Sequence, residues 1–271
     1  MRPVAYCKDY KYLGATINEF LDYNFTTQCL ADSAGRALGS IVTKMIKNGG
    51  FPFNVYSILY DACVTSIADY SGEVFGYNQH QPTLNLHLRA IRAFLGLPKN
   101  SCNVGVLSEV DWLLPQYRTR IKMIRMFNRI SKMDESRLTR KVFNWDRHLN
   151  DTNVISSWSS EVKNIFNDCS MATIYDNIIP FDVKCTTTKM HEIFLKKQQN
   201  YLKTECESKP KLRTFVQFKN FFEIPSYAVK PFFCSEKFHL KSKDWIPSHK
   251  VGDRPVFQAN FRGTPQNLSN M

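Results

Sequence analysis

Runs of apolar residues at helical spacing follow one another along this chain, and glycine or proline closes several of them. The first run spans residues 26–47, and its apolar positions are Leu30, Ala34, Leu38, Ile41, Val42 and Met45. Asn48-Gly49-Gly50 then ends the pattern, because glycine commonly follows the last turn of a helix. Further runs of this kind lie at residues 84–95, 115–133, 135–149, 157–167 and 184–207. The pattern predicts a mainly α-helical fold.

Shorter helices are expected between these runs. Pro52 suits the first turn of a helix, whose apolar side would carry Val55, Ile58, Leu59, Ala62 and Cys63. A short helix is predicted near residues 104–110, and a proline opens another in SKPKLRTFVQFKNFFEI, residues 208–224. GRALGS, residues 35–40, lacks the lysine of a phosphate-binding loop. Its small residues favour close packing against a neighbouring helix.

The two ends of the chain differ from this helical middle. CKDYKYLGATI, residues 7–17, has a strand-like pair of tyrosines, then Leu13-Gly14 and a second strand-like piece, which predicts a β-hairpin. From about residue 237 onward, Pro, Gly, Asn and Ser occur without a sustained period, which predicts a loosely structured tail. We expect a hairpin region at 1–25, a helical domain at 26–149, a helical extension at 150–235 and an irregular or disordered tail at 236–271.

Positive charge is concentrated in two segments. The chain carries a formal net charge of +12. Residues 118–147 hold ten Lys or Arg against three Asp or Glu, and residues 184–219 hold nine against three. Clustered positive charge is the usual footprint of a nucleic-acid partner. Ordinary solvated helix faces are the alternative interpretation.

The helix expected at 115–133 carries a regular line of cations. Arg118, Lys122, Arg125, Arg129 and Lys132 recur at spacings of four, three, four and three. Such spacing places them on one stripe of a helix, next to an apolar stripe of Tyr117, Ile121, Ile124 and Phe127. Like charges at i and i+4 repel by a few tenths of a kcal/mol per pair, which a row of phosphates would offset. A plain solvated face remains open, and Tyr117 and Phe127 are expected in the core rather than stacked on bases.

Motifs for catalysis are missing from the sequence. The eight cysteines form no CxxC pair, His191-Glu192 is followed by Leu195 where a zinc protease needs a second histidine, and no G-x-S-x-G occurs. We therefore expect no catalysis by this chain, no metal site and no cofactor. The first residues have no apolar signal region, and no run of about eighteen apolar residues suggests a membrane span. These features predict an intracellular protein, cytoplasmic or nuclear, that makes no use of a membrane.

The YKYLGATI segment resembles the C-terminal part of a reverse transcriptase from a non-LTR retrotransposon, a LINE of the jockey-like kind. ALGSIVTKM, residues 37–45, is similar to the first thumb helix of that family. LYDACVTSIADYSGEVFGY, residues 59–77, resembles a later pattern, with Ser71 inserted before Gly72 and Phe75 where tryptophan is usual. LHLRAIRAFLGLPKNSCNVGVLSEVDWLLPQYRTRIKMIRMFNRISKM, residues 86–133, and SKPKLRTFVQFKNFFEIPSYA, residues 208–228, extend the resemblance to about residues 6–230.

The resemblance implies a helical, thumb-like bundle behind the last hairpin of a palm subdomain. Tyr12, Leu13 and Gly14 would then lie near the grip on the primer end, and a hairpin without its sheet would be poorly supported. The family's three catalytic aspartates, which hold two magnesium ions, have no counterpart in this sequence.

The resemblance thus implies a non-catalytic fragment of a retrotransposon-derived reverse transcriptase that binds RNA or an RNA–DNA duplex electrostatically. The residues expected to contact nucleic acid are Arg89, Arg92, Arg118, Lys122, Arg125, Arg129 and Lys132. Two alternatives stay open. One is a helical interaction module for an acidic protein, and the other is a pseudogene product without function.

Overall fold

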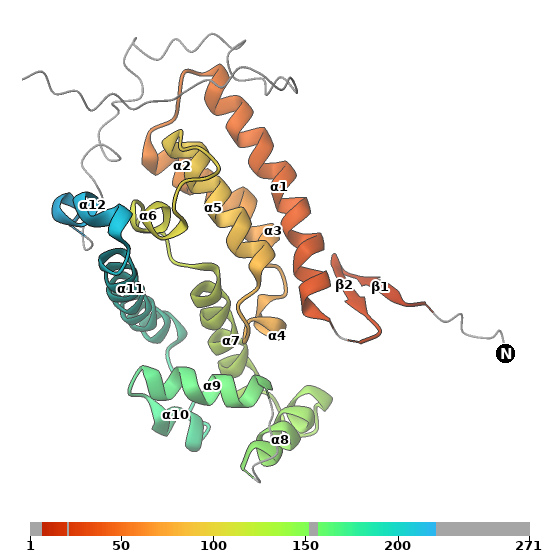
Figure 1. Cartoon of the computed structure of the whole chain (residues 1–271). Coiled ribbons are helices and arrows are strands. Elements are labelled where there is room, and N and C mark those ends of the chain that lie inside the picture. Colours follow the sequence, from red (N-terminus) through yellow and green to blue (C-terminus); the bar gives the residue numbers. More distant parts are fainter. Residues whose placement is uncertain (1–6, 21, 152–156, 221–271) are drawn as a thin grey trace, which may run out of the picture. The chain divides into compact units, whose positions relative to one another are not determined.

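The computed structural model describes residues 7–20, 22–151 and 157–220 of the chain (Figure 1). Most of these residues are helical, and a short antiparallel hairpin precedes the helices, so the predicted mainly α fold is confirmed. The predicted tail at 236–271 lies outside the described residues. Within the described part, no helix combines the length and apolarity needed to cross a lipid bilayer.

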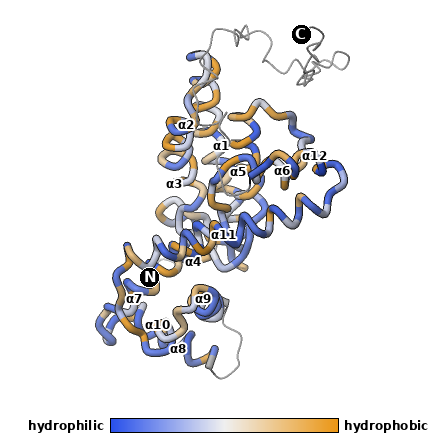
Figure 2. Tube along the Cα trace, turned by 90° about the vertical axis from the view of Figure 1, so that its left-hand side faces the viewer, coloured by the Kyte–Doolittle hydropathy of each residue, from blue (hydrophilic) through white to orange (hydrophobic). Residues whose placement is uncertain are grey.

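The elements follow the sequence runs closely. They are β1 (Asp9–Tyr12), β2 (Ala15–Asn18), α1 (Tyr23–Lys47), α2 (Phe53–Leu59), the π-helix η1 (Tyr60–Thr65), α3 (Ser66–Ala68), α4 (Gly72–Phe75), α5 (Gln81–Leu95), α6 (Asn103–Ser108), α7 (Pro115–Ser131), α8 (Leu138–Asp151), α9 (Ser157–Asp168), α10 (Ala172–Asp176), α11 (Val183–Glu207), the 3₁₀ turn η2 (Pro210–Leu212) and α12 (Arg213–Phe218). In Figure 2, hydrophilic and hydrophobic positions alternate along the helical tubes, as amphipathic helices require.

Helix α1 begins earlier than the apolar pattern indicates. Asp22 is its N-cap, and the Asp22 carboxylate accepts a hydrogen bond of 2.9 Å from the backbone N–H of Asn24. The hydroxyls of Thr26 and Thr27, within the first turns of α1, donate to the carbonyls of Thr16 and Asn24. The first of these bonds, at 2.5 Å, attaches strand β2 to α1.

The N-terminal core lies between α1, α2, η1 and α5. Its buried residues include Leu38, Tyr56, Tyr60, Val64 and Phe94. The face predicted for the helix after Pro52 is wrong, because Val55 and Ile58 are exposed while Tyr56 and Tyr60 are buried. Both tyrosines reach hydrogen-bond partners on α5: the Tyr56 hydroxyl donates to the carbonyl of Ala90 at 2.9 Å, and Tyr60 bonds His87. Satisfied hydroxyls make burial of these large rings favourable.

A second core gathers residues from α7 through α11. It includes Ile124, Phe127, Phe143, Phe166 and Phe194, which are all nearly inaccessible to solvent. Phe127 contacts the rings of Phe143, Phe166 and Tyr175. Residues on both sides of the expected division between 149 and 150 contribute to this core, and the described residues all fall within one compact unit.

The hairpin turns at Leu13 and Gly14, whose φ angles are 46° and 95°. Positive φ at both central residues corresponds to a type I′ turn, which suits the twist of a two-stranded ribbon. Strand β1 is exposed at all four positions, whereas β2 is mostly half-buried. The hairpin is thus held on one side, through β2 and α1, and open on the other.

Candidate nucleic-acid interface

The five cations of α7 share one stripe of the helix but meet two different environments. Arg118 and Lys122 face the turn that follows α3 and bond Asp69. Arg125, Arg129 and Lys132 are exposed to solvent. The first turn of the stripe therefore makes contacts within the fold, and the rest of the stripe is open to solvent.

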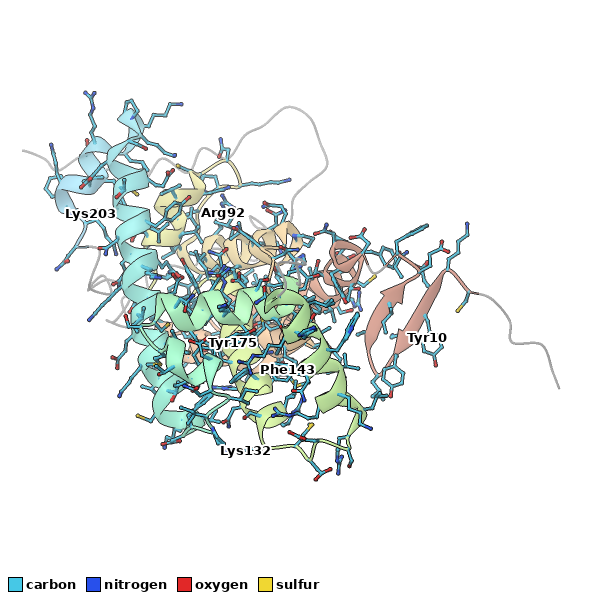
Figure 3. All side chains as sticks on the ribbon, turned by 90° about the horizontal axis from the view of Figure 1, so that it is seen from below. Tyr10, Arg92, Lys132, Phe143, Tyr175 and Lys203 are labelled. Atoms are coloured by element: carbon cyan, nitrogen blue, oxygen red, sulfur yellow. The ribbon has the colours of Figure 1, made fainter. Side chains whose placement is uncertain are left out.

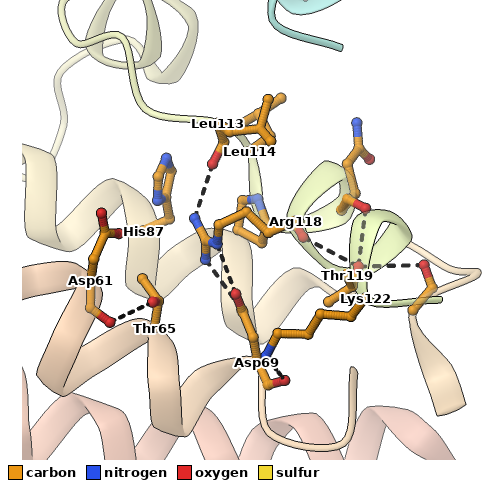
Figure 4. A network of polar contacts seen from close by, with 12 residues as sticks. Asp61, Thr65, Asp69, His87, Leu113, Leu114, Arg118, Thr119 and Lys122 are labelled. Carbon is orange, nitrogen blue, oxygen red and sulfur yellow. Dashed lines mark hydrogen bonds and ion pairs between the residues drawn. The ribbon is translucent and has the colours of Figure 1, made fainter. Parts of the chain in front are cut away.

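Arg118 forms a two-point ion pair with Asp69 (Figure 4). Arg118 Nε lies 2.7 Å from Asp69 Oδ2, Nη2 donates to Oδ1 at 3.2 Å, and Nη1 donates to the carbonyl of Leu113 at 2.9 Å. Only 17% of the Arg118 side chain and 3% of the Asp69 side chain are exposed. Burial alone would lower the pKa of Arg118, but the Asp69 carboxylate outweighs it and raises the pKa. Arg118 is among the residues expected from the sequence to contact phosphate, but its donors are engaged inside the fold.

Lys122 is also drawn into this contact. Its Nζ donates to the backbone carbonyl of Asp69 at 2.5 Å. Desolvation lowers the pKa of the Lys122 ammonium, and the charge of Asp69 opposes that shift. Lys122 thus helps to fix the turn after α3. The sequence places Lys122 among the phosphate ligands, but its ammonium group is already bonded within the fold.

Arg125, the first exposed cation of the stripe, lines an open cleft of about 470 Å³. The cleft is lined by Tyr60, Asp61, Thr65, Ser66, Asp69, Asp111, Trp112, Leu113, Arg118, Ile121, Lys122, Arg125 and His191. Desolvation raises the pKa of the Asp61 carboxyl, although nearby Arg118 opposes the shift. The cleft therefore carries both signs of charge, with Arg125 as its exposed arginine.

An aromatic stack lies beside the cleft. The rings of Tyr60 and Trp112 are parallel, with 4.3 Å between their centroids, and the Trp112 indole N–H donates to the Ser57 hydroxyl at 3.0 Å. The hydroxyl of Tyr60 is 2.9 Å from Nδ1 of the buried His87. Burial raises the pKa of Tyr60 to about 12. A π-helix starts at Tyr60, a type of turn that often marks functional sites and that helical periodicity does not predict.

The two arginines of α5 are engaged with other elements. Arg92 Nη2 donates to the Ser101 carbonyl at 2.9 Å and to Asn103 Oδ1 at 2.5 Å, so Arg92 ties α5 to the start of α6 and the residues just before it. Arg89 is exposed, and its guanidinium lies directly over Gly35 of α1. Figure 3 shows Arg92 well away from Lys132. Of the two arginines expected to contact nucleic acid from α5, Arg92 is therefore engaged within the fold and Arg89 remains exposed.

The three residues compared with a primer grip sit on the exposed turn of the hairpin. Tyr12 and Leu13 are 56% and 72% exposed, and a side chain on Gly14 would meet the ring of Tyr70. Tyr117 and Phe127 lie in or against the core as predicted, since Phe127 is fully buried and Tyr117 stacks on Phe194. Among the described residues, no group of three or more His, Cys, Asp or Glu could hold a metal ion.

Comparison with known proteins adds no relative. No protein-family model, no curated protein and no solved structure matches this chain. The resemblance to retrotransposon reverse transcriptases therefore rests on the sequence segments alone.

Proposed function

We propose that the exposed end of the α7 stripe binds the sugar-phosphate backbone of RNA or of an RNA–DNA duplex. This basic end consists of Arg125, Arg129 and Lys132. The observation that carries the proposal is that these three cations share a stripe and point to solvent, although Arg118 and Lys122 of the same stripe are paired internally. The three positive charges repel one another, and the described residues include no carboxylate that pairs with them. Phosphates would offset this repulsion.

The dimensions of the basic end suit a nucleic-acid strand. Arg125 and Lys132 are seven residues apart, or roughly 10 Å along a helix at about 1.5 Å per residue. Along one strand of a B-form duplex, phosphates recur about every 3.4 Å of helix axis, so about three of them fit beside the three cations. Contacts of this kind position a backbone and carry no sequence information. Binding without sequence preference is the expected result.

The proposed role is one of binding without catalysis by this chain. The guanidinium and ammonium groups of the basic end supply positive charge for binding a backbone. Cationic groups do not bind the metal ions that nucleotidyl transfer needs. Together with the motif resemblance, this supports our proposal that the chain is a non-catalytic, thumb-like fragment derived from a retrotransposon reverse transcriptase.

A titration of labelled RNA across a series of salt concentrations tests the proposal. Three phosphate contacts to a single strand predict that log K falls against log salt with a slope of about −2. An RNA–DNA duplex should bind with a comparable or steeper slope. Absence of measurable affinity for either nucleic acid at low salt would remove the proposed function.

A further inference from the structure

Helix α8 turns two of its arginines toward the protein. Arg140 is 8% exposed, and its Nη1 donates to the carbonyl of Ile130 at 3.4 Å. Its guanidinium carbon lies 5.6 Å from the ring centroid of Phe143. Arg147 donates from Nη2 to the carbonyl of Asp176 at 2.5 Å. The inward side of α8 is therefore occupied by Phe143 and by two arginines that donate to backbone carbonyls.

The outward side of the same helix is apolar. Leu138, Val142 and Trp145 are 76%, 53% and 62% exposed. They follow one another at i, i+4 and i+7, which places them on one stripe, here named the α8 apolar stripe. An amphipathic helix normally directs such a stripe to the core. On α8 the core contact is made by Phe143, so the apolar stripe is additional to it.

Trp145 distinguishes this stripe from scattered surface apolar residues, which are common on proteins. Trp112 and Trp158 are half-buried, and their indole N–H groups donate to Ser57 Oγ and to the carbonyl of Glu73. Trp145 instead projects beside two aliphatic side chains. Tryptophan is among the residues that contribute most to protein–protein binding when a partner covers them. The arrangement therefore has the composition of an interaction surface.

The charged residues along the stripe indicate the chemistry of its partner. Arg137 and Lys141 are exposed, and at about 100° per residue they fall on the same border of the stripe. A helix that covers Leu138, Val142 and Trp145 would meet these cations along one edge. We propose that the α8 apolar stripe docks an amphipathic helix of a partner protein, with carboxylates along the edge that faces Arg137 and Lys141.

Two other occupants fit less well. A second copy of this chain would bring together two molecules that each carry a net charge of +12, which opposes association. Nucleic acid could stack a base on Trp145, but it would leave Leu138 and Val142 uncovered. An acidic amphipathic helix covers all three side chains and neutralises the border, so it matches the whole stripe.

The test uses the full chain and two labelled synthetic peptides. Both peptides are amphipathic helices with the same leucine stripe, and one has glutamates while the other has lysines along the border. The proposal predicts that the glutamate peptide binds and the lysine peptide does not. Trp145→Ser and Leu138→Ser should each weaken binding at least tenfold, because both side chains are exposed and their replacement leaves the core intact. Ile58→Ser is the matched control, since Ile58 is 66% exposed on α2.

A charge reversal makes the test sharper. Lys141→Glu should lower affinity for the glutamate peptide and raise affinity for the lysine peptide. No binding of the glutamate peptide, or equal affinity of Trp145→Ser and the native chain, would overturn the proposal. The proposal would also be overturned if RNA, anionic vesicles or self-association of the chain displaced the peptide, because the stripe would then bind one of those partners. Replacing Arg125, Arg129 and Lys132 with glutamine should leave peptide binding unchanged, which separates this inference from the proposed function.

Discussion

The Arg118 guanidinium lies 2.7 Å from the Asp69 carboxylate, and the pair joins α7 to the turn that follows α3. The two residues are 49 positions apart in the sequence. Lys122 adds a bond to the Asp69 carbonyl, and Arg118 adds one to the Leu113 carbonyl. Three segments of the chain, namely α7, the turn that follows α3 and the residues just before α7, are thus held by one polar cluster.

Removal of the carboxylate should destabilise the fold strongly. Asp69→Asn leaves the buried part of Arg118 without its counter-charge, and the loss of one partner of a buried pair costs about 3 kcal/mol or more. Urea denaturation of the native chain and the variant measures the change in the free energy of unfolding. Asp168→Asn is a matched control, because its ion pair with Lys197 is largely exposed and should contribute less than about 1 kcal/mol. Equal effects of the two substitutions would contradict the structural role of Asp69.

Stability should fall as the pH drops below about 6.5, in part because of His87. Burial holds the pKa of His87 well below its ordinary value, so the folded chain keeps this imidazole neutral. The unfolded chain takes up a proton near pH 6.5, and each further pH unit then favours unfolding by up to about 1.4 kcal/mol. His87→Gln should reduce this dependence, as followed by urea midpoints between neutral pH and about pH 5.

Two carboxyl groups should change the stability in the opposite direction to His87 as the pH falls. Burial raises the pKa of Asp61 and of Glu109, so the folded chain binds their protons more readily than the unfolded chain. They stabilise the fold as the pH falls toward their range. Because both are present in native and His87→Gln chains, the difference between the two curves isolates His87. Identical curves would show that His87 does not titrate on unfolding.

Two glycines of the chain should respond oppositely to alanine. A Cβ on Gly76 would lie 2.6 Å from Thr119 Cβ, so Gly76→Ala should push α4 from α7 at a cost of about 1–3 kcal/mol. A Cβ on Gly39 of α1 would meet nothing within 4 Å, and Gly39→Ala should stabilise by up to about 1 kcal/mol. Thermal unfolding of the two variants measures both signs. A destabilised Gly39→Ala chain would contradict the packing of α1.

The hairpin turn should tighten when Leu13 is replaced by asparagine. Leu13 has a φ of 46°, a region that asparagine enters more readily than leucine. Leu13→Asn should slow amide exchange in β1 and β2, while Leu13→Ala should not. The native hairpin is open along β1, so we expect its amides to exchange faster than those of α1. Strong protection of β1 in the native chain would show that the hairpin is better supported than the structure indicates.

Helix positions were predictable because their signals are local. Pro115 begins α7 where the sequence places it, and the run predicted at 184–207 is α11, Val183–Glu207. The N-cap of α1 is harder to predict, because Asp22 lies outside the apolar pattern that marks the helix. The close packing expected at GRALGS is seen at Gly35, where Arg89 of α5 lies directly over the glycine, whereas Gly39 of the same segment meets nothing within 4 Å.

The candidate site depends on contacts that the sequence does not reveal. Spacing alone assigned Arg118 and Lys122 to the same surface as Arg125, and nothing near them in the sequence indicates that Asp69 binds them. Likewise Tyr60 was not expected in the core, because its partner His87 lies 27 residues away on α5. Helical periodicity shows which side chains share a face, but only the packing shows what that face meets.

The most direct test of the basic end of α7 compares two charge-matched variants. One carries Arg125→Gln, Arg129→Gln and Lys132→Gln, and the other carries Lys189→Gln, Lys196→Gln and Lys203→Gln on exposed positions of α11. Both lose three positive charges, and the RNA affinity of each is measured across a salt series. The account predicts that the α7 variant loses the slope of about −2 while the α11 variant keeps it. Equal losses in the two variants, or an α7 variant that binds like the native chain, would contradict it.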